Sequence, residues 1–454
     1  MFSYVRQKLV ASFKNEQHIA PLITLRMAFG LVMLISTIRF MAKGWVHDFY
    51  VVPKITFPFY GFEWVHPLPA IAMYTVFVVM AIACFNIMTA LFYRISITAF
   101  FICFVYVELI DKTYYLNHYY FVSIIAFLLM LVPAHRYFSL DVLRKPALKV
   151  TQVPAWVIYI FKWQLFLVYF FAGISKLNYD WLFRAMPLKM WLPANAGLPL
   201  IGPYLTQTWT AYVSCWFGAI FDLAIGFMLF YKPTRKVAYA LVIIFHVFTG
   251  WFFKIGMFPY IMIATTMIFF SEDVHLKIIH FIKSIIAPKS LQIKDTAISF
   301  QLSSTKKKLI YSLLILYAIV QIVLPFRYIF YPGKLLWTEE GYRFSWRVML
   351  MEKGGNCYFY IKDAKSLRKW QVMNEEFLTP FQERMMQTQP DMILQYAHFL
   401  HNHYQQKGIN DPIVTVESYV TLNGSGSRLY IDPNVDLAKE KENFLPKKWI
   451  LPFQ

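Results

Sequence analysis

Charged residues are scarce in this chain. They make up 15% of its 454 residues, whereas hydrophobic residues make up 58%. A soluble globular domain usually carries roughly 25% charge, so the composition excludes an ordinary soluble protein. Several apolar runs are long enough for a helix to cross the ~30 Å hydrocarbon core of a bilayer. Because a helix satisfies its own backbone hydrogen bonds in lipid, the sequence predicts an α-helical, multi-pass membrane protein.

Cysteine is also rare, which limits the covalent and metal-bound frameworks that the chain could form. Three of the four cysteines fall within apolar runs and the fourth stands alone near the C-terminus: Cys84, Cys103, Cys215 and Cys357. This spacing predicts neither a disulfide framework nor a zinc site. His401 and His403 lie two residues apart on a predicted helix, so they face different ways and make a poor metal pair. We expect no metal.

Acidic residues are few relative to basic ones, with 25 Asp and Glu against 44 Lys and Arg and a net charge of +19. Such an excess could indicate nucleic-acid binding or a membrane surface. The positions of the charges favour the membrane, because Lys and Arg concentrate in the N-terminal segment and in alternate loops between the apolar runs. Basic residues accumulate on the cytoplasmic side of membrane proteins. We therefore expect a cytoplasmic N-terminus and no nucleic-acid partner.

The apolar runs predict about nine membrane spans. Their approximate ranges are 23–41, 69–92, 95–110, 119–132, 155–173, 209–231, 237–253, 255–270 and 309–328. Between the last two, residues 272–288 alternate apolar and charged side chains at helical spacing, which is typical of a helix lying in the membrane interface. An odd number of spans places the C-terminal part of the chain on the side opposite the N-terminus.

Residues 331–454 have the composition of a soluble domain. The stretch "RFSWRVMLMEKGGNCYFYIKD" alternates around Gly354 and Gly355, which predicts a β-hairpin with its turn at this pair. The pattern of "QPDMILQYAHFLHNHYQQ" predicts an amphipathic helix, and "DPIVTVESYVTL" and "SRLYIDP" predict further strands. The predicted fold is therefore a polytopic bundle of about nine transmembrane helices (1–330), followed by a small α+β domain (331–454) on the non-cytoplasmic side.

Polar residues at membrane depth are costly and are functional candidates by default. Three polar stretches fall near the predicted outer face: "LIDKTYYLNHYYF", "FFAGISKLNYDWL" and "FHVFTGWFFKIGMFPYIMI". The predicted topology brings all three to the side that carries the soluble domain. Asp222 and Lys162 lie inside predicted spans, and we expect these two residues to pair across helices.

These stretches carry a family resemblance. The motifs "DKT…NH.Y", "YF.AG..KL..DW" and "FH……IGMF.Y", followed by "YRFSWRVML", "DMILQYA" and "DPNVD", occur in this order along nearly the whole chain. In order and spacing they resemble the vitamin K-dependent γ-glutamyl carboxylase family. The chain is similar to a compact, bacterial member of that family with an HTTM-type membrane domain.

The resemblance implies an enzyme that couples two reactions. Reduced vitamin K, as phylloquinol or menaquinol, is epoxidised by O2, and this step drives removal of a γ-proton from a glutamate in a peptide or protein. The resulting carbanion captures CO2. The implied partners are the quinone, the glutamate-containing substrate and the lipid bilayer, and a bacterial inner membrane is favoured over the endoplasmic reticulum.

Lys112 matches the position that the resemblance assigns to the catalytic base. An amine removed from water gives up its proton more readily, and only a free amine can take a proton from the quinol. Asp111, next to it, would favour the charged amine, so we expect its carboxylate to point elsewhere or to be screened. The alternative is a lysine that extends from a helix end to the membrane interface.

Further residues match the motifs. Asn117 and His118 could hydrogen-bond the quinol, or could instead cap the start of a span. His246 lies well inside a span, where a packing role is the alternative to a catalytic one. Lys176 and Trp181 could orient an anion or the ring of the quinol, although Lys and Trp are also usual at membrane helix ends.

The segment "IGMFPY" resembles the family segment that binds the glutamate substrate. Its glycine and proline interrupt the helix and leave backbone groups free to meet a ligand, although packing alone could explain its apolar side chains. The residues expected to contact substrate are Gly256, Met257, Phe258 and Tyr260.

The sequence also departs from the family. Asn178 stands where vertebrate members have aspartate, and the sequence ends soon after "DPNVD", where those members continue with a large extension. We therefore expect substrate recognition to differ. Two alternatives stay open: quinol epoxidation without efficient carboxylation, and a non-catalytic membrane transporter or assembly protein on the same scaffold. The chain shows no repeated halves, which counts against a transporter.

Overall fold

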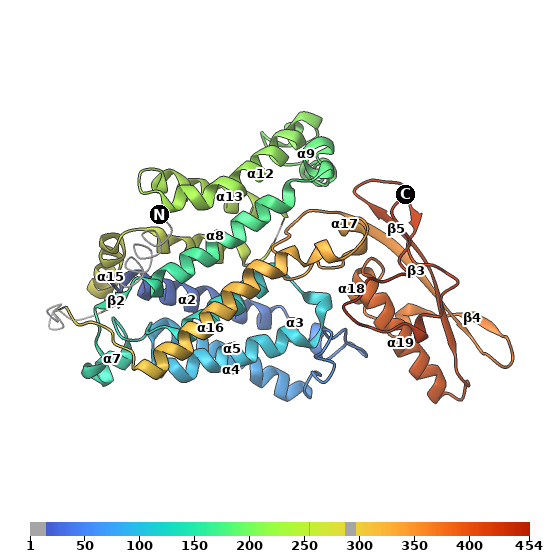
Figure 1. The fold of residues 1–454 in the computed structure, drawn as a ribbon, viewed down its shortest axis with the longest axis horizontal. Helices are drawn as coiled ribbons and strands as arrows, with labels where there is room; N and C mark the ends of the chain where they lie inside the picture. Colours follow the sequence, from blue (N-terminus) through green and yellow to red (C-terminus); the bar gives the residue numbers. More distant parts are fainter. Residues whose placement is uncertain (1–14, 254, 287–296) are drawn as a thin grey trace, which may run out of the picture.

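Apolar helices make up the first three quarters of the chain. The computed structural model describes residues 15–253, 255–286 and 297–454. Within them, seven helices are long and apolar enough to cross a membrane (Figure 1). They are α2 (Ala20–Ala42), α4 (Ala70–Thr89), α5 (Tyr93–Ile110), α8 (Trp156–Lys176), α12 (Thr208–Phe230), α13 (Arg235–Phe253) and α16 (Ser304–Val323), which the 3-10 helix η5 (Leu324–Phe330) continues.

Two of the predicted spans are shorter than the others. The fourth is α6 (Asn117–Leu131), and the eighth is α14 (Phe258–Thr266) continued by η4 (Met267–Phe269). All nine predicted spans are therefore helical in the structure, and seven of them have full membrane-crossing length. Both short helices start at the predicted site segments: α6 begins with Asn117 and His118, and α14 begins after the interruption at Gly256.

Close packing of the bundle depends on glycines at two helix crossings. α2 packs against α4, and α8 packs against α12. A Cβ atom at Gly30 in α2 would lie 2.6 Å from the backbone nitrogen of Met88, and one at Gly173 in α8 would lie 2.7 Å from that of Leu223. Because both neighbours are backbone atoms, any side chain at either glycine would push the helices apart. Small residues at membrane helix interfaces allow this approach.

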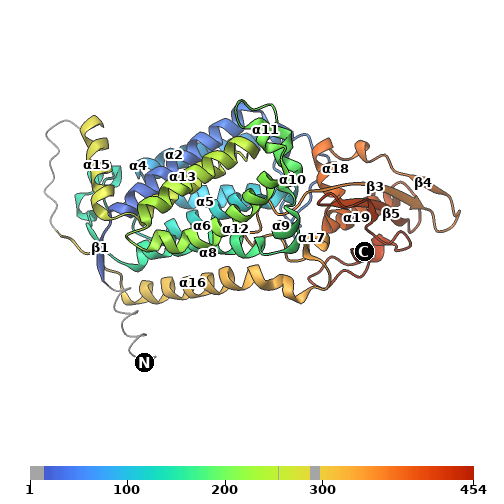
Figure 2. The ribbon, with the colours of Figure 1, turned by 90° about the horizontal axis from the view of Figure 1, so that it is seen from above.

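The bundle has two different ends. The C-terminal domain covers one end, and α15 (Glu272–Ile286) lies at the other with the antiparallel pair β1 (Glu16–His18) and β2 (Gln152–Pro154) (Figure 1). α16 follows the outer side of the bundle and leads from the second end to the C-terminal domain (Figure 2). α15 is the helix predicted over 272–288, and its place in the membrane interface stays a prediction.

The C-terminal domain contains a four-stranded antiparallel sheet in the order β4-β3-β5-β6. Alternate residues of β3 point to a buried face, and Phe359 there packs against Tyr396 with ring centroids 4.8 Å apart. The elements are β3 (Lys353–Lys362), β4 (Lys369–Gln371), β5 (Ile413–Leu422), β6 (Arg428–Leu429), α18 (Pro380–Met386) and α19 (Pro390–Gln406). The predicted α+β fold and the amphipathic helix α19 are confirmed.

The hairpin predicted around Gly354 and Gly355 is wrong. Both glycines lie inside β3, which pairs with β5 rather than with the preceding segment. A Cβ at Gly355 would lie 2.8 Å from the Tyr419 carbonyl oxygen, so glycine allows close strand pairing here and does not form a turn. The preceding segment is irregular, with positive φ at Phe344 and Trp346, because Trp346 is buried against the membrane helix α6.

Short elements connect these parts. They are α3 (Trp45–Tyr50), η1 (Lys112–Tyr114), α7 (Leu140–Arg144), η2 (Pro146–Leu148), α9 (Tyr179–Arg184), α10 (Leu188–Trp191), η3 (Leu192–Asn195), α11 (Gly202–Leu205), α17 (Leu335–Thr338), η6 (Asn374–Glu376) and η7 (Leu437–Lys439). Of these, η1 matters most for the site, because it carries the "DKT" motif and contacts α18 of the C-terminal domain.

Candidate functional site

Two histidines from different predicted motifs meet around one aromatic ring inside the helical bundle. His118 is in the first turn of α6, His246 is in α13, and Phe258 begins α14. The ring centroid of Phe258 lies 5.6 Å from that of His118 and 5.4 Å from that of His246. The imidazoles of both predicted segments therefore line one buried place, which we call the histidine cluster (His118, His246 and Phe258).

His246 is fixed on one side and unpartnered on the other. Its Nε2 atom lies 2.9 Å from the hydroxyl of Tyr169 in α8, while its Nδ1 atom has no hydrogen-bond partner and the residue is 1% exposed. A buried polar atom without a partner is costly. The arrangement thus leaves one imidazole nitrogen available for a hydrogen bond to a ligand. Sequence reasoning missed Tyr169, because this residue lies among apolar residues and its place in "YF.AG" is its only motif signal.

A cation lies beside the interruption between α13 and α14. Gly256 has a φ of +65°, and the space where its Cβ would stand is 3.4 Å from Nη2 of Arg39, near the end of α2. Met257, next along, accepts a contact from the Ser36 hydroxyl at 3.1 Å. In the part of the chain that the structure describes, no carboxylate pairs with Arg39. Sequence reasoning missed this residue, because an arginine at the end of an apolar helix is the usual membrane pattern.

Lys176, at the end of α8, forms a buried ion pair. Its Nζ lies 2.7 Å from Oδ2 of Asp222 in α12 and 5.3 Å from the ring centroid of Trp181. The expected pairing of Asp222 with Lys162 is wrong. Lys162 lies near the opposite end of α8, against the rings of Tyr159 and Phe269, whereas Asp222 is level with the last turn of that helix.

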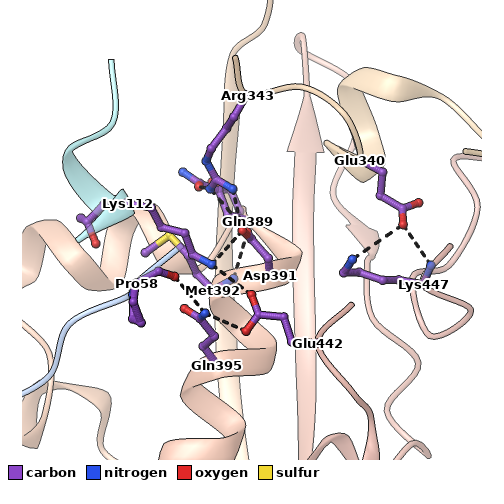
Figure 3. A network of polar contacts seen from close by, with 12 residues as sticks. Pro58, Lys112, Glu340, Arg343, Gln389, Asp391, Met392, Gln395, Glu442 and Lys447 are labelled. Carbon is purple, nitrogen blue, oxygen red and sulfur yellow. Dashed lines mark hydrogen bonds and ion pairs between the residues drawn. The ribbon is translucent and has the colours of Figure 1, made fainter. Parts of the chain in front are cut away.

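Lys112 reaches into the C-terminal domain and not into the histidine cluster. Its Nζ lies 2.9 Å from Oδ2 of Asp391 in α19 and 3.6 Å from Oε1 of Glu442, and its side chain is 1% exposed (Figure 3). Arg343 also binds Asp391, at 2.5 Å. Burial alone would raise the pKa of Asp391, but Arg343 and Lys112 hold it well below its ordinary value. The four groups form a closed network of two cations and two anions, which we call the interdomain network (Lys112, Arg343, Asp391 and Glu442).

Asp111 points away from the lysine beside it. Its two carboxylate oxygens accept hydrogen bonds from the Thr113 backbone at 2.9 Å and from Nε2 of Gln382 in α18 at 3.0 Å. The prediction that this carboxylate is directed elsewhere is confirmed. Burial raises the pKa of Asp111 to about 6, against the lowering effect of these hydrogen bonds. Asp111 therefore fastens η1 to the C-terminal domain.

The remaining predicted residues are divided between the two regions. Asn117 donates to the Arg347 carbonyl oxygen at 2.8 Å, so it contacts the C-terminal domain and makes no capping bond. Tyr260 is 67% exposed on the outer side of α14 and does not line the cluster. In the described residues no group of three or more His, Cys, Asp or Glu could hold a metal ion.

Comparison with known protein families covers most of the chain. Residues 14–274 match the model of the HTTM domain, and residues 306–454 match that of the vitamin K-dependent gamma-carboxylase lumenal domain. No solved structure matches the chain. The two matches join, in one polypeptide, the helices that carry the histidine cluster and the domain that closes the interdomain network. With its seven long apolar helices, the chain is a multi-pass membrane protein and belongs to the vitamin K-dependent gamma-carboxylase family.

Proposed function

We propose that this protein uses a reduced naphthoquinone, O2 and CO2 to carboxylate glutamate side chains at the γ-carbon. The observation that carries the proposal is the meeting of His118, Phe258 and His246 at one buried place, with Nδ1 of His246 unpartnered. These residues come from separate motifs that the family shares. Two imidazoles on one aromatic ring and an unpartnered buried nitrogen together favour a polar ligand at this place.

The histidine cluster suits a quinol. Its walls are aromatic, and the free nitrogen of His246 can hydrogen-bond a ring hydroxyl, while Tyr169 holds the ring in place through a hydrogen bond to the other nitrogen. When bound with O2, the quinol supplies the oxidative driving force for removal of the γ-proton from glutamate. The protein's own residues orient the ring, keep water away and move the first proton. Phylloquinol and menaquinol both fit this description.

Arg39 supports the second half of the reaction. A guanidinium without a carboxylate partner, beside a backbone interruption at Gly256, is suited to bind the carboxylate of a glutamate side chain. Gly256, Met257 and Phe258 then place this carboxylate next to the cluster. Tyr260 belongs to the lipid-facing side of α14, so we do not include it in the glutamate site.

Two lysines are candidates for the base that takes the quinol proton. Lys112 is the residue predicted from the resemblance, but its amine is held between Asp391 and Glu442 of the C-terminal domain and does not reach the histidine cluster. Lys176 contacts a single carboxylate among the described residues, that of Asp222. It also lies two turns, or about 10 Å, from Tyr169 on the same helix. We therefore assign the base to Lys176 and a docking role to Lys112.

The proposed orientation follows from the charge pattern. Basic residues in alternate loops place the N-terminus in the cytoplasm, and the C-terminal domain and the histidine cluster then face the outer side. A bacterial inner membrane fits this arrangement, with the glutamate substrate reaching the site from the outer side.

The test is a coupled assay on detergent-purified protein supplied with reduced vitamin K, O2, ¹⁴C-bicarbonate and a glutamate-containing peptide. We expect both epoxide and fixed label. Lys176→Met should lower both rates by about 100-fold or more, the usual effect of losing a general base. Because this variant leaves Asp222 without its partner, Lys176→Met/Asp222→Asn serves as the matched variant with no unpaired buried charge.

Lys112→Met distinguishes the two lysines. We expect a lower unfolding temperature and an activity that follows the folded fraction. If Lys112→Met is folded, stable and inactive while Lys176→Met is active, the base is Lys112. Epoxide without label would support the epoxidase alternative, and neither product from folded wild-type protein would contradict the proposed function.

A further inference from the structure

A second polar cavity lies at the end of the bundle opposite the C-terminal domain. Its volume is about 470 Å³, and it is lined by the first turn of α5, the end of α6, the loop after α6 and the segment that leads into α16. Its polar wall includes the basic side chains of Arg94, Arg136 and Lys306 and the imidazole of His135. In Figure 1 these helix ends lie at the end of the bundle that carries α15, opposite the end that the C-terminal domain covers.

The charge of this cavity is of one sign. Among the described residues, three cations line it and no Asp or Glu does. None of Arg94, Arg136 and Lys306 forms an ion pair within the described residues. Arg94 donates one hydrogen bond to the Met130 carbonyl oxygen. Arg136 lies over the Phe300 ring, and its Nε atom has no hydrogen-bond partner. The site thus has excess hydrogen-bond donors and uncompensated positive charge.

The loop that carries His135 and Arg136 is fixed by hydrogen bonds from α2. Arg26 in α2 donates to the carbonyl oxygens of Ala134 at 2.9 Å and of Phe138 at 3.0 Å. His135 is 7% exposed and stacks on Tyr93 with ring centroids 5.4 Å apart, and its Nδ1 atom has no hydrogen-bond partner. Burial and the neighbouring Arg94 and Arg136 lower the pKa of His135 to about 4, so the ring is neutral at pH 7 and needs a hydrogen-bond partner.

The other wall of the cavity is apolar. Leu131, Leu309 and Ile310 line it, and the outer edge of this wall is open, with Leu309 61% exposed and Ile95, next to Arg94, 72% exposed. In a membrane these side chains contact lipid chains. The cavity therefore spans the boundary at which the headgroup of a lipid meets its acyl chains.

We propose that this cavity binds the phosphate headgroup of an anionic phospholipid. Arginine guanidiniums and a lysine ammonium are the groups that bind phosphate oxygens, and basic pockets between membrane helices on the cytoplasmic side accept such headgroups. The charge pattern places this end of the bundle in the cytoplasm. The apolar wall favours a lipid over free phosphate, because it would lie against acyl chains. This proposal does not depend on the enzymatic one.

The test is a titration of the purified full chain, in neutral detergent, with phosphatidylglycerol, and native mass spectrometry measures the bound fraction. We expect Arg136→Gln/Lys306→Gln to raise the Kd for the first bound lipid at least tenfold. Lys232→Gln/Lys236→Gln is the matched control, since it removes two exposed basic residues at the same end of the bundle outside the cavity. We expect this control to bind as the wild type does.

Two further arms identify the source of the phosphate. Phosphatidylcholine should bind at least tenfold more weakly than phosphatidylglycerol, and inorganic phosphate at millimolar concentration should not displace the lipid. Equal loss in both double variants, equal binding of the two lipids, or displacement by inorganic phosphate would overturn the proposal. Unchanged unfolding temperatures of both variants without lipid exclude misfolding as the cause of a lost signal.

Discussion

The interdomain network should make docking of the C-terminal domain depend on Asp391. Its carboxylate contacts Lys112 at 2.9 Å and Arg343 at 2.5 Å, and its side chain is 24% exposed. Asp391→Asn removes the charge and keeps the shape. Breaking a fully buried ion pair costs about 3–5 kcal/mol, and an exposed pair is worth about 1 kcal/mol or less.

The structure sets the magnitude between these limits. Partial exposure lowers it, and each cation keeps another partner, because Lys112 still has Glu442 at 3.6 Å and Arg343 still has Gln389. We therefore expect Asp391→Asn to lower the free energy of unfolding by about 2–3 kcal/mol. Thermal unfolding in detergent measures the loss, and faster hydrogen exchange in η1 and α19 locates it at the domain contact.

A double-mutant cycle identifies the partner. Lys112→Met and Asp391→Asn together should cost about 1–2 kcal/mol less than the sum of the single variants, because the two groups contact each other. Glu375→Gln, which changes an exposed carboxylate of the same domain, should leave stability within about 0.5 kcal/mol. Additive effects, or a loss in Asp391→Asn no larger than in Glu375→Gln, would refute the network as the fastening between the domains.

Three further predictions concern other parts of the chain. Asp111 has a folded-state pKa of about 6, above the usual value of 3.8, so its contribution to stability is present below about pH 4 and is lost as the pH rises to about 6. Asp111→Asn should flatten this part of the stability–pH curve by up to about 3 kcal/mol, measured as unfolding temperature between pH 4 and 7, and an unchanged curve would contradict the assignment. Gly173→Ala should cost about 1–3 kcal/mol through its clash with the Leu223 backbone, whereas Gly197→Ala, which meets nothing within 4 Å, should be nearly neutral in the same unfolding measurement. His246→Phe should lower epoxide formation by about 100-fold or more without lowering the unfolding temperature by more than a few degrees, and a normal rate in a folded protein would show that His246 only packs.

Hydropathy was enough to predict the helices, because the bilayer requires long apolar runs and each such run can only be a helix. Hydropathy was a weaker guide to α6 and α14, because both helices are short: α6 begins with polar residues and α14 begins after the interruption at Gly256. The positive φ values and buried Trp346 in the segment before β3 show why the predicted hairpin failed. Contacts with α6, far away in sequence, outweigh the local alternation around Gly354 and Gly355.

The candidate site was predictable as a set of motifs but not as a set of contacts. The motifs include His118, His246 and Phe258, and the structure brings these three together. The partners of the charged residues could not be predicted from the sequence. Lys112 and Asp391 are 279 residues apart in the sequence, and Lys176 and Asp222 lie on different helices, α8 and α12. Local spacing contains no information about such pairs.

Carboxylation of glutamate coupled to oxidation of a reduced quinol is the activity proposed for this membrane protein. The most direct measurement is mass spectrometry of a glutamate peptide after incubation with purified wild-type protein, reduced vitamin K, O2 and bicarbonate, alongside chromatography of the quinone. We expect peptide that is heavier by one CO2, epoxide formed in the same reaction, and neither product when O2 or the reduced quinol is omitted. Unmodified peptide and unconverted quinol, from protein shown to be folded, would contradict it.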